Sequence, residues 1–259
     1  MRRASLEAAM MLHAALTFWL LVIVFCAWGV HRIWGGLLRP RTVNMLLLPG
    51  TLVAQLGYVL GVLVTGGTVN NTTIIKDDET AEPQQADNPR PRIPIIGPVA
   101  IAMLPLVACG VGLYAVWAYL GGEVMSGMAA RSVPAVLPLS LGGFWALLHE
   151  LITIAEQLVD GVRSSDLWQL RTAVFIYLVI CLTVRMAPFP GNLRGSLGAV
   201  VLVGVIAALA SSLTGATDAA IQRGWAVLSF AVGALLVLLM ISLLIRGLVE
   251  LVRVLARQG

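Results

Sequence analysis

Long runs of apolar residues, separated by shorter polar or charged connections, dominate the chain. Several of these runs hold about 20 nearly uninterrupted apolar residues, which is the length that an α-helix needs to cross a bilayer. The runs cover residues 11–30, 45–65, 95–120, 136–161, 172–186, 195–213 and 225–251. The pattern predicts an all-α fold: a polytopic transmembrane helical bundle with 6–7 membrane-spanning helices, in a single integral membrane domain formed by residues 1–259.

The composition agrees with a membrane protein. Of the 259 residues, 59% are hydrophobic and only 12% are charged, whereas soluble domains carry about 25% charged residues. The net charge of +4 rests on arginines at the ends of the apolar runs, where we expect them to meet lipid headgroups. No basic patch with interleaved aromatic side chains supports nucleic acid as a partner. We expect the bacterial inner (cytoplasmic) membrane as the location.

One long polar segment, residues 67–93, interrupts the apolar pattern. It contains an acidic run at Asp77, Asp78 and Glu79 and several prolines. Such a composition cannot bury a core, so we expect a solvated, largely irregular loop. The alternative is that this loop is a contact site for a partner protein.

The second apolar run carries small residues at helical spacing. Gly50, Ala54, Gly57 and Gly61 recur at i, i+4, i+7 and i+11, so that they form one stripe of a helix. Small side chains let a second helix approach closely in lipid. The stripe therefore predicts a helix-packing surface.

The same run resembles a helix of the intramembrane zinc metalloproteases known as the site-2 protease family. In that family a similarly opened helix carries His-Glu-x-x-His, and the matching positions here are Ala54, Gln55 and Tyr58. A zinc protease needs three ligands, and it needs a carboxylate to take a proton from the metal-bound water. Ala54 has no donor atom and Gln55 cannot act as a base, so the resemblance implies a core that has lost catalysis.

The resemblance extends over residues 44–200. A helix led by Gly97 and Pro98 follows, and residues 186–193 resemble the motif Met-x-Pro-Ser-x-x-Asp-Leu, whose aspartate is the expected third ligand. Asn192 stands at that aspartate position. The resemblance thus implies a vestigial site of Ala54, Gln55, Tyr58 and Asn192, with no metal and no cofactor. It also predicts that the helix carrying Tyr58 packs against residues 188–192, with the Tyr58 hydroxyl near the Asn192 amide.

A second polar pattern lies in the run at 136–161 and just beyond it. Polar side chains recur there on one helical stripe, at His149, Thr153, Glu156, Asp160 and Arg163. The stripe is typical of a polar face at a membrane boundary, or it faces the protein interior. A shifted metal site that uses His149, Glu156 and Asp160 is the functional alternative.

These patterns favour a non-catalytic integral membrane protein that acts as a scaffold or as a subunit of a membrane complex. Its expected partners are the lipid bilayer and other membrane protein subunits or helices. One alternative is a channel or transporter subunit, which would need intramembrane charges or broken helices. Another is a metal-dependent membrane hydrolase with a non-standard site around His149. The three cysteines, Cys26, Cys109 and Cys181, lack the spacing of a metal site.

Overall fold

The computed structural model of the chain describes residues 2–67, 96–122, 124, 132–135, 137–138, 140–187, 193–214 and 216–258. Almost all of the predicted polar loop, residues 68–93, lies outside the described residues, as does Asn192. Within the described part of the chain the fold is all-helical, and no strand occurs. The helices are α1 (Arg2–Leu37), α2 (Pro40–Leu46), α3 (Leu48–Val64), α4 (Ile96–Leu120), α6 (Leu141–Ser164), α7 (Leu170–Val184), α8 (Leu193–Thr214) and α9 (Ala216–Gln258).

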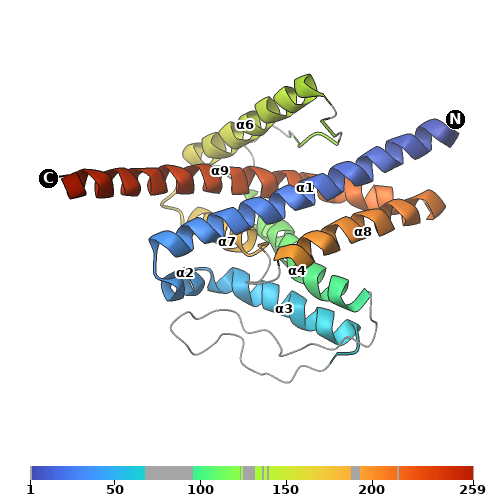
Figure 1. Cartoon of the computed structure of the whole chain (residues 1–259), viewed down its shortest axis with the longest axis horizontal. Helices are drawn as coiled ribbons and strands as arrows, with labels where there is room; N and C mark the ends of the chain where they lie inside the picture. Colours follow the sequence, from blue (N-terminus) through green and yellow to red (C-terminus); the bar gives the residue numbers. More distant parts are fainter. Residues whose placement is uncertain are drawn as a thin grey trace.

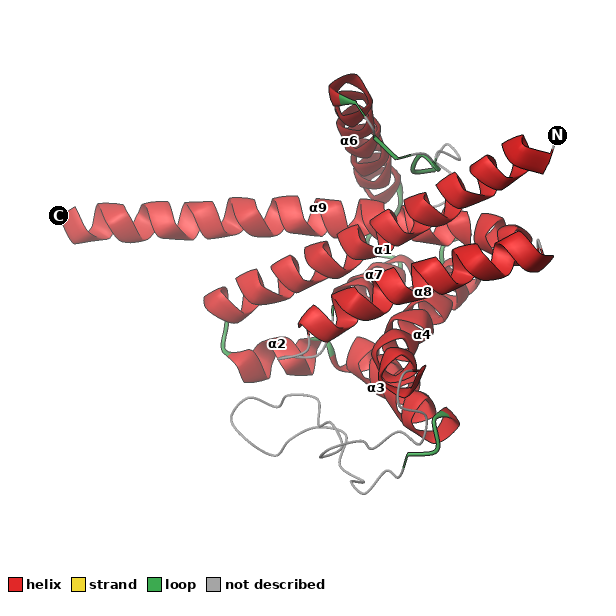
Figure 2. Ribbon diagram, turned by 45° about the vertical axis from the view of Figure 1, so that its right-hand side comes forward, coloured by secondary structure: helices red, strands yellow, loops and turns green. Residues whose placement is uncertain are grey.

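Two long helices, α1 and α9, form the frame of the bundle. They run side by side in the same direction along its long axis (Figure 1). Helix α8 packs against α1, while α3 and α4 make the most extensive helix pair on the other side of the bundle. Helix α7 lies in the middle and contacts α3, α4 and α9, and α6 packs on α9 (Figure 2).

The core is built from apolar side chains contributed by helices that lie far apart in sequence. Trp19 on α1, Leu113 on α4, Phe175 on α7 and Leu235 on α9 are fully or almost fully buried in one cluster. Aromatic rings add directed contacts. The ring of Phe230 stacks on that of Trp117, and its centroid lies 6.2 Å from the ring centroid of Phe175. Burial of such side chains ties four helices into one domain.

Three described helical segments are long and apolar enough to cross a membrane: Met10–Leu37, Gly97–Leu120 and Ile221–Ala256. A fourth crossing is formed if α2 and α3 count together as one bent span. The chain is therefore an integral membrane protein, but this count is lower than the 6–7 spans predicted from sequence. Helix α7 has 15 residues, fewer than the roughly 20 that a full crossing requires. The apolar segment described within the 22-residue helix α8, Ser196–Ala208, is also shorter than a full crossing.

Helix α6 is the third reason for the lower count. Leu147, Ile154 and Leu158 on one face of α6 are buried, whereas His149 and Asp160 on the other face are exposed. Its first residues follow the side-chain cap of Ser140, whose hydroxyl accepts from the backbone N–H of Gly143 at 3.0 Å. An amphipathic helix of this kind lies on a bundle or at an interface rather than across a bilayer.

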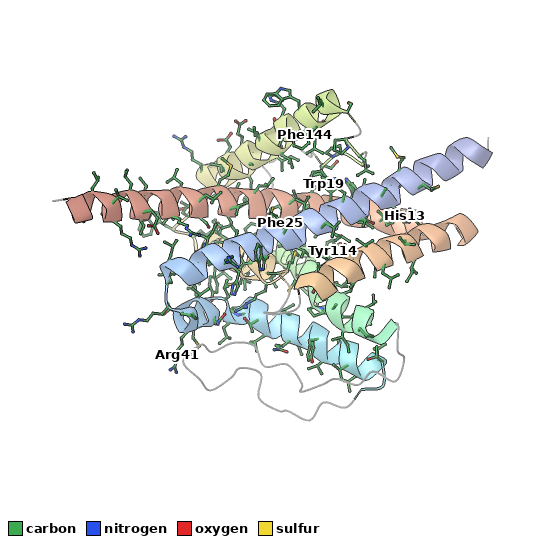
Figure 3. All side chains as sticks on the ribbon, viewed as in Figure 1. His13, Trp19, Phe25, Arg41, Tyr114 and Phe144 are labelled. Carbon is green, nitrogen blue, oxygen red and sulfur yellow. The ribbon has the colours of Figure 1, made fainter. Side chains whose placement is uncertain are left out.

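The outer surface carries many large apolar side chains. Phe25 on α1, Tyr114 on α4 and Phe144 on α6 are each at least half exposed, and they come from three different helices (Figure 3). Arg41 on α2 projects away from the bundle in the same view. Exposed apolar faces of this extent are compatible with contact to the acyl chains of a lipid bilayer.

Candidate functional site

The run predicted as one helix at 45–65 is broken at Leu47. Helices α2 and α3 meet there at a bend of 78°. Proline opens each helix, Pro40 in α2 and Pro49 in α3, because its fixed φ suits the first turn and its missing N–H costs nothing there. The break turns the backbone carbonyl of Leu46 outward from its helix. The Tyr177 hydroxyl of α7 donates to that carbonyl at 2.8 Å, and the Cys181 thiol lies 3.5 Å from it.

A polar contact between α2 and the end of α7 lies beside this break. The Nη2 atom of Arg185 donates to Oδ1 of Asn44 at 2.7 Å, and both residues are buried, at 7% and 6% exposure. His31 of α1 is close enough to Arg185 to interact electrostatically with it. We call the contact of Asn44, Arg185, Tyr177 and the Leu46 carbonyl the polar junction. It corrects the sequence-based expectation that the arginines meet lipid headgroups, since Arg185 lies inside the protein.

Among the residues that the structure describes, the polar junction supplies hydrogen-bond donors, and its hydrogen bonds join no nucleophile to a base. A guanidinium, an amide and a phenol can hold backbone groups or a bound anion, whereas a nucleophile needs a base within hydrogen-bond reach. The thiol of Cys181 is directed at a backbone carbonyl instead. Chemically, the arrangement satisfies a backbone carbonyl at a helix break and joins α2 to α7.

The small-residue stripe lies on the buried face of α3. A Cβ added at Gly57 would stand 2.5 Å from the Leu104 carbonyl oxygen, and one at Gly61 would stand 3.0 Å from the Cα of Ile101. Both contacts are to the backbone of α4. A Cβ at Gly50 would overlap the carbonyl group of Cys181 on α7. The stripe thus faces two helices, α7 at its first turn and α4 further along.

The positions that the resemblance matches to the zinc-binding motif lie on the same buried face. Ala54, Gln55 and Tyr58 are exposed by 1%, 5% and 5%. The predicted contact of Tyr58 with Asn192 cannot be compared with the structure, because Asn192 is outside the described residues. The end of α7, which precedes that region in sequence, meets the first turn of α3 at Gly50.

The second polar pattern lies on the outside of α6. His149, Glu150, Glu156, Asp160 and Arg163 are all exposed, and the Thr153 hydroxyl donates to the backbone carbonyl of His149 at 3.0 Å. The stripe therefore faces away from the protein interior. Of the two placements that its spacing allowed, this agrees with an outer polar face and not with a stripe directed into the protein. Among the residues that the structure describes, no group of three His, Cys, Asp or Glu side chains is arranged to hold a metal ion.

A short extended segment around Val133 is held inside the bundle by side chains. Trp225 Nε1 donates to the Val133 carbonyl at 2.7 Å, and the Val133 N–H donates to Ser229 Oγ at 3.0 Å. Trp19 Nε1 donates to the Pro134 carbonyl at 3.0 Å. Non-helical backbone within a membrane protein needs such partners, because hydrocarbon offers none. No feature of the sequence pattern pointed to this network, since its members lie about a hundred residues apart.

Comparisons with protein-family models, with curated proteins and with solved structures find no match to this chain.

Proposed function

We propose that the chain is a non-catalytic subunit or scaffold of a membrane complex, and that the second half of α9 binds a helix of a partner protein. The observation that carries the proposal is an exposed apolar stripe on a part of α9 that leaves the bundle. The proposal includes the bacterial inner membrane as the location.

Helix α9 is longer than a bilayer requires. Its apolar segment, Ile221–Ala256, has 36 residues, which corresponds to about 54 Å of helix against a hydrocarbon core of roughly 30 Å. Near the end of α1, Trp34 Nε1 donates to Ser242 Oγ of α9 at 2.8 Å. Beyond that point α9 projects past the other helices (Figures 1 and 2). A crossing that begins near Ile221 is complete by about residue 241, so the remainder extends toward the headgroups and water.

This remainder carries exposed apolar side chains over most of its surface and charged side chains on one face. Five of the apolar side chains follow a spacing of three and four residues and are exposed by 49–64%; we call them the α9 stripe, Ile241, Leu244, Leu248, Leu251 and Leu255. Arg246, Glu250 and Arg253 lie on the opposite face, where Arg253 pairs with Glu250 at 3.1 Å. A spacing of alternately three and four residues is the pattern of helix-to-helix seams, in which apolar knobs fit between residues of a facing helix. A partner helix is therefore the occupant that the stripe fits best.

Co-purification tests the proposal. The wild-type chain and a Leu248→Gln/Leu251→Gln variant would be purified from native membranes in mild detergent, and the partners would be identified by mass spectrometry. A Leu243→Gln/Val254→Gln variant is the matched control, because it removes two exposed apolar side chains from outside the stripe. We expect a partner that is retained by the wild type and the control and lost from the stripe variant. Equal recovery with all three proteins would contradict the proposal.

The absence of catalysis rests on the residues that fill the positions of the matched protease motif. Ala54, Gln55 and Tyr58 offer neither a set of zinc ligands nor a carboxylate base, and they are packed inside a close helix contact. Burial of unpaired histidines and a carboxylate without a metal would cost several kcal/mol. Replacement of all three is what a fold would require if it kept its helices after losing the metal. Descent from a site-2-protease-like core is part of this proposal.

A channel or transporter subunit is the second candidate function. It is favoured by the break between α2 and α3 beside the buried Arg185–Asn44 contact, since transporters place irregular backbone and buried polar groups along their substrate paths. Ion-flux measurements on the purified chain in liposomes separate the two candidates. Flux that is abolished by Asn44→Leu would favour the transporter, and an impermeable proteoliposome favours the subunit. The hydrolase alternative around His149 gains no support, because that stripe faces away from the bundle and no three His, Cys, Asp or Glu side chains of the described residues are arranged to hold a metal ion.

A further inference from the structure

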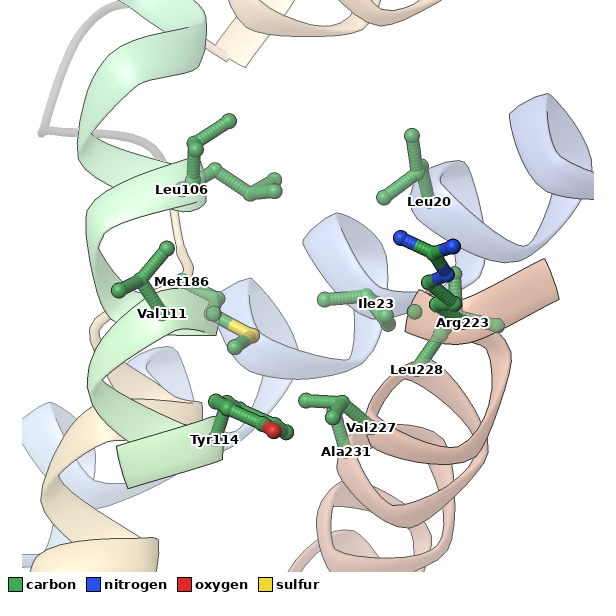
Figure 4. A pocket seen from close by; sticks show the side chains of 13 residues that line it. Leu20, Ile23, Leu106, Val111, Tyr114, Met186, Arg223, Val227, Leu228 and Ala231 are labelled. Atoms are coloured by element: carbon green, nitrogen blue, oxygen red, sulfur yellow. The ribbon is translucent and has the colours of Figure 1, made fainter. Parts of the chain in front are cut away.

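An apolar groove lies on the outside of the bundle between α1, α4 and α9. Its volume is about 660 Å³, within the range of roughly 300–1,000 Å³ that small-ligand sites occupy. Leu106, Val111 and Tyr114 of α4 form one wall, and Leu20 of α1 with Val227 and Ala231 of α9 form the other (Figure 4). Val111 and Tyr114 are exposed by 63% and 58%, so the groove opens outward, to the side where lipid surrounds a membrane protein.

A single cation lines this otherwise apolar groove. Arg223 of α9 lies beside Leu20 at one end of the opening (Figure 4). It is exposed, and within the described part of the chain it makes no hydrogen bond or ion pair. Arg223 lies just before the apolar run at 225–251. That places it where a membrane helix meets the headgroup region, within reach of a phosphate by its long side chain.

We infer that the groove binds one anionic phospholipid, with an acyl chain between α4 and α9 and the phosphate at Arg223. The apolar walls match a hydrocarbon chain, and the cation at one end matches the negative charge of a headgroup. Glycine leaves part of the space open, because a Cβ added at Gly110 or Gly224 would meet no atom within 4 Å. This inference concerns another face of the protein and does not depend on a partner helix at the end of α9.

Two variants test separately whether lipid binding depends on the positive charge of Arg223 and on the open volume of the groove. Arg223→Gln removes the cation and leaves the walls intact, so the preference for an anionic over a zwitterionic headgroup should fall about fivefold, the factor expected for one cation near an anionic membrane surface. Gly110→Phe fills the groove from α4 and should abolish tight binding of either lipid. Each has a matched control elsewhere: Arg246→Gln for an exposed cation of α9, and Gly198→Phe for an open glycine of α8.

The experiment is native mass spectrometry of the full chain released from nanodiscs that contain equal amounts of phosphatidylglycerol and phosphatidylcholine. The expected result is one retained phosphatidylglycerol on the wild type and both controls, a loss of headgroup preference in Arg223→Gln, and no retained lipid in Gly110→Phe. Retention by Gly110→Phe at the wild-type level would overturn the groove as the site. Equal losses of preference in Arg223→Gln and Arg246→Gln would overturn the role of Arg223. Thermal unfolding of each variant in the same detergent verifies that it is folded.

Discussion

Arg185 and Asn44 are 141 positions apart in sequence and are joined by a buried hydrogen bond of 2.7 Å. The bond connects the residue that follows α7 to the short helix in front of the break at Leu47. It lies next to the contact of Tyr177 with the Leu46 carbonyl. Together these contacts hold a sharply bent segment in place within the membrane domain.

Removal of the hydrogen-bond acceptor Asn44 from the polar junction should destabilise the protein. We expect Asn44→Ala to lower the free energy of unfolding by about 1.5–3 kcal/mol, because a hydrogen bond to a charged group is lost in a buried place. The exposed pair of Arg253 and Glu250 provides the control. Glu250→Gln should cost less than about 1 kcal/mol, because solvent screens that pair. Thermal or denaturant unfolding in detergent measures both, and equal effects would contradict a structural role for the junction.

The extended segment around Val133 gives a second stability prediction. Trp225→Phe keeps most of the ring but removes the donor to the Val133 carbonyl. A buried carbonyl without a partner costs about 1–3 kcal/mol, so the variant should unfold more easily by that amount. The matched control is Trp145→Phe on α6, because the Trp145 side chain is 73% exposed. If Trp145→Phe destabilised the protein as strongly, the hydrogen bond would not be the cause.

Close packing of α3 on α4 predicts opposite outcomes for two glycines. In Gly57→Ala the new methyl group would overlap the Leu104 carbonyl and the Ala108 side chain, so the helices must separate, at a cost of about 1–3 kcal/mol. In Gly247→Ala the methyl group meets no atom within 4 Å, and the lower chain entropy of the unfolded state should stabilise the protein by about 0.4–1 kcal/mol. Melting temperatures in one detergent should shift in opposite directions. A shift of both in the same direction would contradict the packing argument.

Elemental analysis tests the loss of the metal site. We expect purified protein to contain no stoichiometric zinc, because Ala54, Gln55 and Tyr58 stand at the positions that match two ligands and the base. Membrane fractions should be prepared without chelators, so that a bound ion is not stripped. One zinc per chain that disappears in His149→Ala would instead support the hydrolase alternative on α6.

The sequence was sufficient for the class of fold and for its longest helices. Apolar runs at 11–30, 95–120 and 225–251 correspond to the three segments that can cross a membrane, because a run of that length has few other stable environments. The runs at 172–186 and 195–213 were less informative. Hydropathy does not distinguish a helix packed among other helices from a full crossing. That ambiguity accounts for the difference between the predicted 6–7 spans and the three or four candidate spans of the described residues.

The break at Leu47 and the polar junction were not predicted. Pro49 sits within the first turn of α3, so a helix start was visible, but the run 45–65 is apolar throughout and hides the end of α2. Asn44 and Arg185 each resemble ordinary residues at the end of a span. Only tertiary contact makes them partners, and one sequence carries no information about which distant residues meet. For the same reason the lipid groove, assembled from three helices, could not be inferred from any one of them.

Site-specific cross-linking at the α9 stripe tests the central proposal most directly. Leu248→Cys places a thiol on the stripe, Val254→Cys places one outside it, and the three natural cysteines are buried and give little background. After labelling of the thiol with a maleimide that carries a photoactivatable benzophenone, irradiation of native membranes should join Leu248→Cys, but not Val254→Cys, to a second membrane protein that mass spectrometry then identifies. If Leu248→Cys stays uncross-linked, or if both variants yield the same adducts, the end of α9 is not a helix-binding surface and the account of this chain as a complex subunit is contradicted.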